Sequence, residues 1–164
     1  MAELVEAARG GDRIAFGELY VRFARTVHGI LLARGPGADV DDLVQDVFVI
    51  ALQRLRTLRD ANAFGGWLAA IARNRAADQW RRAPQTTELT DEVATVRGDR
   101  TDALAVLAAI RRLPDAYRET LVLRLVEGMT GPEIAARTGL TPASVRVNLH
   151  RGMKQLRERL GAPA

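Results

Sequence analysis

Cysteine is absent from this sequence of 164 residues, so disulfide bonds and thiolate metal sites are excluded. Aromatic residues make up only 5% of the chain. No apolar run approaches the length of a membrane span, and no segment has the pattern of a signal peptide. We therefore expect a soluble, cytoplasmic protein without membrane insertion.

The sequence also lacks the residue combinations that most enzymes need. Its two histidines, His28 and His150, fall on separate predicted domains. There is no cysteine nucleophile, no glycine-rich phosphate loop and no cluster of metal ligands. We predict that the protein is not an enzyme and binds no metal or cofactor, and we interpret His28 as a helix-packing residue.

Helical periodicity covers nearly the whole chain, and no alternating strand pattern appears. A hydrophobic content of 48% is enough for folded cores. The patterns predict helices at 2–9, 39–55, 63–82, 103–113 and 114–127. A further long helix is expected to begin at Asp12 and to end at Gly35-Pro36-Gly37. The expected inward sets are Phe16, Leu19, Tyr20, Phe23, Val27 and Ile30 in the second helix, and Leu43, Val44, Val47, Ala51 and Leu55 in the third.

Residues 83–101 lose this periodicity and become polar, which is typical of a linker. The predicted fold class is therefore all-α, with two small helical domains at 1–82 and 102–164 joined by a flexible linker at 83–101. Neither domain is large, so each core should be of modest stability.

Two helix starts on either side of a short turn dominate the second domain. Thr130 can cap one helix, with a glutamate three positions later completing a capping box, and Gly139 ends it. Thr141 caps the next helix, and Pro142 occupies its first position. This arrangement predicts a helix-turn-helix, the fold of many proteins that read duplex DNA.

The last helix, from Pro142 to Leu160, has two different faces. Small residues and cations point outward, as a helix in a major groove requires. Residues 111–164 hold 10 basic and 5 acidic residues, which favours DNA, although a solvated basic surface helix would show the same pattern. The inward set is Val145, Leu149, Leu156 and Leu160 beside Gly152; the outward set is Ala143, Val147, Arg151 and Lys154, flanked by Arg146, His150 and Arg157.

The first domain has two notable helices. Carboxylates gather at the start of the third helix, residues 39–46, where they favourably oppose the helix dipole and offer too few ligands for a metal. In the fourth helix Trp67, Asn74 and Arg81 form a stripe beside the core residues Phe64, Leu68 and Ile71. An aromatic among arginines suits single-stranded nucleic acid, although a tryptophan alone is more often a core residue.

Four segments resemble the extracytoplasmic-function (ECF) sigma factors of bacterial RNA polymerase, in the same order. They are DLVQDVF at 42–48, FGGWLAAIARNRAADQWRR at 64–82, LPDAYRETLVLRLVEGMTGPEIAARTG at 113–139 and SVRVNLHRGMKQLR at 144–157. The resemblance covers both domains, which would correspond to sigma regions 2 and 4.

The resemblance implies an alternative sigma factor that binds core RNA polymerase, directs it to promoters and helps to open the DNA. Region 2 would bind the β′ clamp coiled coil through Asp42, Gln45 and Asp46. It would contact the minus-ten element through Arg59, Asn62, Phe64, Trp67, Arg73, Asn74 and Arg81, with the loop at 59–63 capturing a flipped base. Region 4 would read the minus-thirty-five element through Ser144, Arg146, Val147, Asn148, His150, Arg151 and Lys154.

The implied partners are core polymerase (the β′ clamp and the β subunit), promoter DNA and an anti-sigma factor that covers the polymerase-binding surfaces. The linker would thread the polymerase channel, and the protein would associate with the nucleoid through the polymerase. No residue pattern here is specific to an anti-sigma factor.

The chain departs from the family pattern at Val147 and Asn148, where relatives commonly carry a small polar and a basic residue, and at Gly152, which replaces a common alanine. The resemblance therefore does not fix the promoter preference, but Val147, central on the outward face, is expected to contact a thymine methyl group. Two alternatives stay open: a helix-turn-helix regulator that binds operators without polymerase, and a helical decoy that titrates a regulator through a sigma-like surface.

Overall fold

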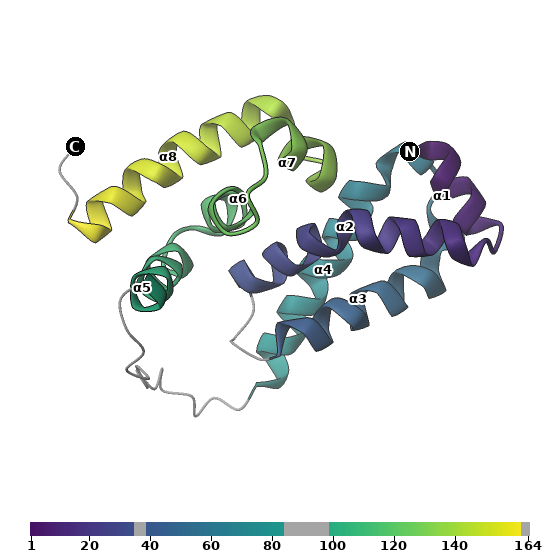
Figure 1. The fold of residues 1–164 in the computed structure, drawn as a ribbon, viewed down its shortest axis with the longest axis horizontal. Coiled ribbons are helices and arrows are strands. Elements are labelled where there is room, and N and C mark those ends of the chain that lie inside the picture. The colour runs from purple at the N-terminus through teal and green to yellow at the C-terminus, as the bar shows by residue number, and fades with distance from the viewer. Residues whose placement is uncertain (35–38, 84–98, 162–164) are drawn as a thin grey trace.

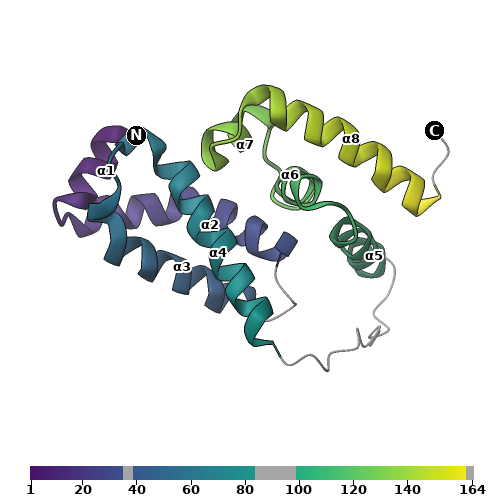
Figure 2. The same ribbon diagram turned by 180° about the vertical axis from the view of Figure 1, so that it is seen from behind.

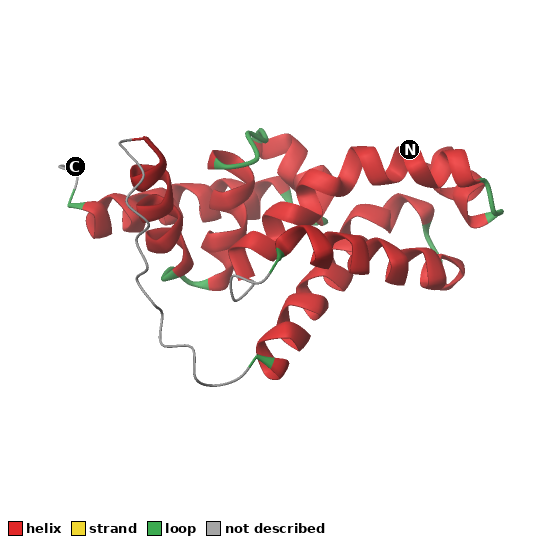
Figure 3. Cartoon of the chain, turned by 60° about the horizontal axis from the view of Figure 1, so that its bottom comes forward, coloured by secondary structure: helices red, strands yellow, loops and turns green. Residues whose placement is uncertain are grey.

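The computed structural model describes residues 1–34, 39–83 and 99–161, and within these residues every regular element is helical (Figure 3). The predicted all-α fold class is confirmed. The N-terminal half, residues 1–83, holds α1 (Ala2–Arg9), α2 (Arg13–Arg34), α3 (Val40–Arg54), η1 (Leu55–Thr57), η2 (Ala61–Ala63) and α4 (Phe64–Arg82). The C-terminal half, residues 99–161, holds α5 (Asp99–Arg111), α6 (Asp115–Leu125), α7 (Gly131–Thr138) and α8 (Pro142–Leu160).

Local capping explains why several helices start where they do. The carboxylate of Asp12 accepts hydrogen bonds from the backbone N–H groups of Ile14 and Ala15, and Asp39 does the same for Asp41 and Asp42. α5 starts at Asp99, inside the predicted linker and before its expected start at Ala103. Residues 84–98 of that linker and the predicted stop at 35–37 lie outside the described residues.

The N-terminal half is built around α2, which packs against α1, α3 and α4 (Figure 1). All five residues expected to face inward from the predicted helix at 39–55 are buried, four in α3 and Leu55 in η1, as are Leu19, Phe23, Val27 and Ile30 of α2. Phe16 is half-buried, and Tyr20 is 38% exposed because it lies at the edge of the core, with its ring 4.6 Å from that of Phe48. The inward prediction for Tyr20 is therefore wrong.

The C-terminal half is arranged around α6, which contacts α5, α7 and α8. Val145 and Leu156 of α8 are buried as predicted, and Gly152 is buried against α6, where an added Cβ would lie 3.0 Å from Cδ1 of Leu121. Leu160, predicted to face inward, is 46% exposed because it lies in the last turn of α8, outside both apolar clusters of this half.

The two halves also pack tightly against each other, which the sequence did not predict. α6 packs against α2, and α7 packs against the start of α4 (Figures 1 and 2). A Cβ added to Gly29 would lie 2.6 Å from Cδ2 of Leu123, and one added to Gly139 would lie 2.8 Å from the Cα of Gly66. Glycine at position 29 makes room for the Leu123 side chain of α6, and glycine at positions 66 and 139 lets the two backbones touch.

Two buried threonines provide a matched test of how this core treats hydroxyl groups. The Thr26 hydroxyl has no hydrogen-bond partner among the described residues, whereas Thr138 donates to the carbonyl of Ile134 at 2.6 Å. Because valine has nearly the same shape, Thr26→Val should raise the free energy of unfolding by about 1 kcal/mol, while Thr138→Val should lower it by about 1 kcal/mol. Urea denaturation measures both, and a loss of stability in Thr26→Val would contradict the assignment.

Candidate nucleic-acid interface

The direction of α8 is fixed by caps on both sides of the preceding turn. The predicted capping box is present: the Thr130 hydroxyl accepts from the N–H of Glu133, and the Glu133 carboxylate accepts from the N–H of Thr130 at 2.8 Å. The bond from the Thr130 backbone holds the pKa of Glu133 below its usual value. Gly139 ends α7 at φ +75°, and the Thr141 hydroxyl accepts from the N–H of Ser144 at the start of α8.

α8 carries its predicted outward residues on the surface of the molecule, along the outer side of the C-terminal half (Figure 1). Val147 is 44% exposed at the centre of this face, and Asn148 is half-buried. The exposed residues of the predicted set are Ser144, Arg146, Val147, His150, Arg151 and Lys154.

The cations of α8 remain available for an external anion. None of its five basic residues forms an ion pair with another residue in the part of the chain that the structure describes. Unpaired guanidinium and ammonium groups beside short side chains fit phosphates and base edges of a duplex.

On α3 the predicted residues Asp42, Gln45 and Asp46 are all exposed. Asp46 already accepts a charge-assisted hydrogen bond from Arg75 of α4 at 2.7 Å. The sequence analysis did not single out Val49 and Leu52, which are 54% and 55% exposed on the same helix. In the sequence, their signal is that they are apolar, lie one and two turns beyond Gln45 and do not belong to the predicted inward set of this helix. Exposed apolar side chains of this kind fit a protein partner.

The residues predicted to contact the minus-ten element lie in different environments. Arg59 and Asn62 are exposed around η1 and η2, and Asn74 is exposed on α4. Arg81 is also exposed and pairs with Asp78. Trp67 is half-buried with its ring 5.8 Å from that of Phe64, so one part of its surface packs on the core and the other remains free.

Phe64 requires a correction. Its side chain is only 1% exposed and its ring makes an edge contact with that of Phe23 at 5.1 Å. A residue enclosed in the core cannot contact DNA, so Phe64 does not belong to the residues that contact the minus-ten element. Its ring packs against that of Trp67 on the core side.

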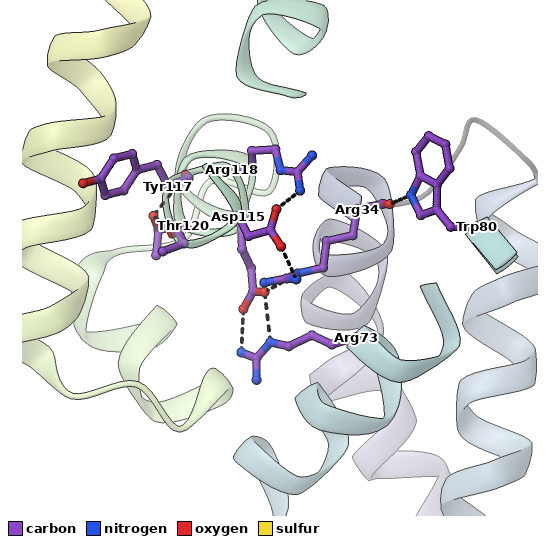
Figure 4. Close-up of polar contacts among 9 residues, drawn as sticks. Arg34, Arg73, Trp80, Asp115, Tyr117, Arg118 and Thr120 are labelled. Carbon is purple, nitrogen blue, oxygen red and sulfur yellow. Dashed lines mark hydrogen bonds and ion pairs between the residues drawn. The ribbon is translucent and has the colours of Figure 1, made fainter. Parts of the chain in front are cut away.

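Arg73, also predicted to contact DNA, is bound to the other half of the chain. Its guanidinium donates to both carboxylate oxygens of Glu119 on α6, at 2.6 and 3.0 Å. Arg34 of α2 donates to the same carboxylate at 3.0 Å, and Figure 4 shows the two arginines reaching it from separate helices. The hydrogen bonds that Arg73 donates to Glu119 raise the pKa of its guanidinium.

A second carboxylate of the C-terminal half, Glu127, joins the N-terminal half in a similar way. It lies 2.5 Å from Nδ1 of His28 and also pairs with Arg25. His28 therefore lies at the packing contact of α2 with the α6 region, as the sequence predicts, and it makes a polar contact there between the two halves. Its hydrogen bond to Glu127 raises the pKa of His28, so with the carboxylate ionised this contact is fully present below the ordinary histidine pKa and is lost as the pH rises through the raised value.

Sequence reasoning missed Glu119 and Glu127 as partners of the other half. The sequence does hold a signal for Glu119. It lies two residues before the apolar residues at 121–123 of α6, where an acid can be buried only beside a cation. Within the described ranges no group of residues could hold a metal ion, and no helix is long and apolar enough to cross a membrane.

Comparison with known proteins decides the family. The model of Sigma-70 region 2 matches residues 19–85, and the model of Sigma-70 region 4 matches residues 103–156. The sigma factor CarQ of Myxococcus xanthus is 34% identical over 96% of this chain and 95% of its own length. The ECF sigma factor SigF of Caulobacter vibrioides is 32% identical over 92% and 88%.

The chain belongs to the ECF sigma factors. It is thus an alternative sigma factor of bacterial RNA polymerase. The alternative of a helix-turn-helix regulator that binds operators without polymerase does not account for the region 2 match in front of the helix-turn-helix. This sigma factor spans 64% of the length of BldN of Streptomyces coelicolor, to which it is 32% identical. Its structure superposes on 98% of CnrH, solved in complex with the cytosolic domain of CnrY, with a TM-score of 0.68 and 29% identity.

Val147 allows a sharp test of promoter reading by this sigma factor. Its position on α8 predicts contact with a thymine methyl group, which serine cannot make and threonine can. In the polymerase complex, Val147→Ser should lose about 1 kcal/mol of discrimination at one thymine of the upstream element, and Val147→Thr should keep it. Affinities for single-base promoter variants measure this, and unchanged preference at every thymine in Val147→Ser would count against the contact.

Proposed function

We propose that this sigma factor binds core RNA polymerase through α3, reads the minus-thirty-five element with α8 and holds the opened minus-ten strand on α4. The observation that carries the proposal is the basic face of α8, which forms no ion pair with any described residue and is held by two capped helix starts in the half that matches region 4. Three surfaces of the chain support the three roles.

Region 4 has the charge and shape for duplex DNA. Arg151 and Lys154 can contact phosphates on either side of the groove, while Ser144 and Val147 are short enough for the base edges to come close. Arg146, Asn148 and His150 flank this line. Phosphate contacts would position the helix, and the short side chains would supply the sequence preference.

Region 2 is suited to unpaired bases. Trp67, Asn74 and Arg81 lie along α4 and combine an aromatic face, an amide and a cation, and the segment from Arg59 to Ala63 lies just before this helix. Base capture there must offset a few kcal/mol of unpairing and unstacking for each base. Strand opening would then be a binding equilibrium that needs no nucleotide hydrolysis.

The polymerase would supply the chemistry and would be held by the exposed face of α3. Asp42, Gln45 and Asp46 offer acceptors to the β′ coiled coil, and the exposed Val49 and Leu52 add apolar area beside them. The segment at 83–101 would follow the polymerase channel past the β subunit. The protein would act in the cytoplasm and would associate with the nucleoid through its binding to the polymerase.

An anti-sigma factor is a further proposed partner. CnrH, which shares the fold of this chain over its whole length, was solved with the cytosolic domain of CnrY bound. By this likeness, a regulatory protein would hold the sigma factor away from polymerase by covering surfaces such as α3.

Run-off transcription tests the proposed function directly. Core polymerase and this protein together should start defined transcripts on promoters selected from genomic DNA, and neither should do so alone. Tight binding of the protein alone to a palindromic site, without transcription, would contradict the proposal.

Trp67 should be required for opening and not for upstream binding. Trp67→Ala should abolish permanganate reactivity of the melted thymines in the polymerase complex, because it removes the aromatic face on which a base can stack. Footprinting of the upstream element should stay nearly unchanged. Trp67→Phe is the matched control, since it keeps a ring on Phe64 and should retain part of the reactivity; normal melting in Trp67→Ala would refute the role.

A further inference from the structure

The first helix of the chain packs against the segment to which we assign base capture. That segment, residues 59–63, is named the capture loop here and ends in η2. α1 contacts η2 as well as α2, and its Val5 and Ala8 are buried in the core of the N-terminal half. α1 also precedes residues 19–85, which match the region 2 model, so that match assigns no role to this helix.

Arg9, in the last turn of α1, reaches the backbone directly before the capture loop. Its Nη1 donates to the carbonyl oxygen of Leu58 at 3.0 Å, 49 positions further along the sequence. Its Nη2 pairs with Glu6 one turn earlier on α1, and this pair orients the guanidinium. In the described ranges, no other side chain from outside residues 58–63 donates a hydrogen bond to this stretch. α1 therefore holds the start of the loop through a single group.

The loop itself is extended and presents its polar side chains to solvent. The backbones of Leu58 and Asp60 are extended, with ψ angles of 116° and 114°. Leu58 and Ala61 are buried, whereas Arg59, Asp60 and Asn62 are exposed. The Asp60 carboxylate accepts hydrogen bonds from the backbone N–H of Asn62 at 2.9 Å and from its side-chain amide at 3.2 Å. The loop is thus held at both ends, and its exposed side chains start from a defined backbone.

A loop that recognises one unpaired base binds better when its conformation is set before the base arrives. Ordering a loop during binding costs conformational entropy for each residue that becomes fixed, and a preformed loop avoids this cost. Discrimination between bases depends on hydrogen bonds to a base edge, which require donors and acceptors held within about 0.5 Å. A contact that fixes the backbone can therefore act on base preference without touching the base.

We propose that Arg9 is a positioning residue for base selection in the minus-ten element, because its hydrogen bond to Leu58 holds the capture loop in the conformation that accepts the flipped base. This inference rests on the proposed function. It gives α1 a part in promoter reading although no residue of α1 needs to contact DNA. If Arg9 served only to attach α1 to the core, its loss would change stability and not base preference.

Substitutions at Arg9 separate the hydrogen bond from the other properties of the side chain. Arg9→Met and Arg9→Gln remove the bond, because methionine has no donor and glutamine is too short, and both residues are good helix formers. Arg9→Lys keeps a cationic donor of nearly the same reach. Lysine lacks Nε, but the Nε of Arg9 has no hydrogen-bond partner among the described residues, so nothing is lost there. The matched control is Glu6→Gln, which removes the ion pair within α1 and leaves the bond to Leu58.

Amide hydrogen exchange of the free protein measures the state of the loop directly. Arg9→Met and Arg9→Gln should speed exchange of the amides at 58–63 by roughly tenfold, while the amides of α3 and α8 exchange as in the parent chain. Arg9→Lys and Glu6→Gln should match the parent throughout. Parental exchange of the loop in both Arg9→Met and Arg9→Gln, or equal acceleration in every helix, would overturn the positioning role.

Open-complex formation with core polymerase measures the step in which the loop acts. Promoters with each of the four bases at each minus-ten position give a ratio of rates for the preferred base and the others. At one position this ratio should fall by roughly fivefold in Arg9→Met and Arg9→Gln, and Arg9→Lys should restore it. A smaller amount of active protein would lower all rates equally and leave the ratio unchanged. Equal losses in Arg9→Met and Arg9→Lys would overturn the role of the hydrogen bond.

A double-mutant cycle tests whether Arg9 acts through the loop. Replacing Arg59 and Asn62 together by alanine removes exposed side chains of the capture loop that would contact the base. Arg9→Met in that background should change the ratio little further, because both changes remove the same interaction. Independent effects that add would place the action of Arg9 outside the loop and overturn the assignment.

The parent chain separates this inference from the proposed function. A parent without base preference anywhere in the minus-ten element would disprove the proposed role of region 2, and this inference with it. A parent with a clear preference that Arg9→Met and Arg9→Gln both retain would disprove the role of Arg9 alone.

Discussion

A buried carboxylate needs cations, and Glu119 finds both of its cations in the other half of the chain. This one interaction determines how the two halves meet, because Arg34 and Arg73 can reach it only when α6 packs on α2 and α4. Glycines at the helix contacts then allow the backbones to come together. The junction combines these charged contacts with apolar packing of Ala33 in the cluster that holds Ile110 and Leu121.

Each half keeps a structure of its own under this contact. The N-terminal half has a continuous core around α2, and the C-terminal half has two apolar clusters on either side of α6. Only the end of α2 enters the neighbouring core, where Ala33 packs with Ile110 and Leu121. The exposed faces of α3 and α8, to which we assign polymerase binding and duplex reading in the proposed function, lie away from the contact between the halves.

Local signals in the sequence predicted most of the fold. The caps at Asp12, Asp39, Thr130 and Thr141 start helices as expected, because capping depends on residues within one turn. Periodicity placed the core of α3 correctly, yet it could not show that Tyr20 and Leu160 lie at the edge or end of their helices. The pairing of Glu119 with Arg73, 46 residues away, leaves no periodic trace, so the sequence predicts Arg73 only as a DNA contact. For the same reason the sequence does not show that His28 pairs with Glu127.

The distance between the two halves is the most direct test of the account. Since the chain has no cysteine, single cysteines placed at the exposed Gln53 of α3 and Glu158 of α8 can carry spin labels without background labelling. The account predicts one short distance in the free protein and a much longer one in the complex with polymerase and promoter. The same distance in both states would contradict it.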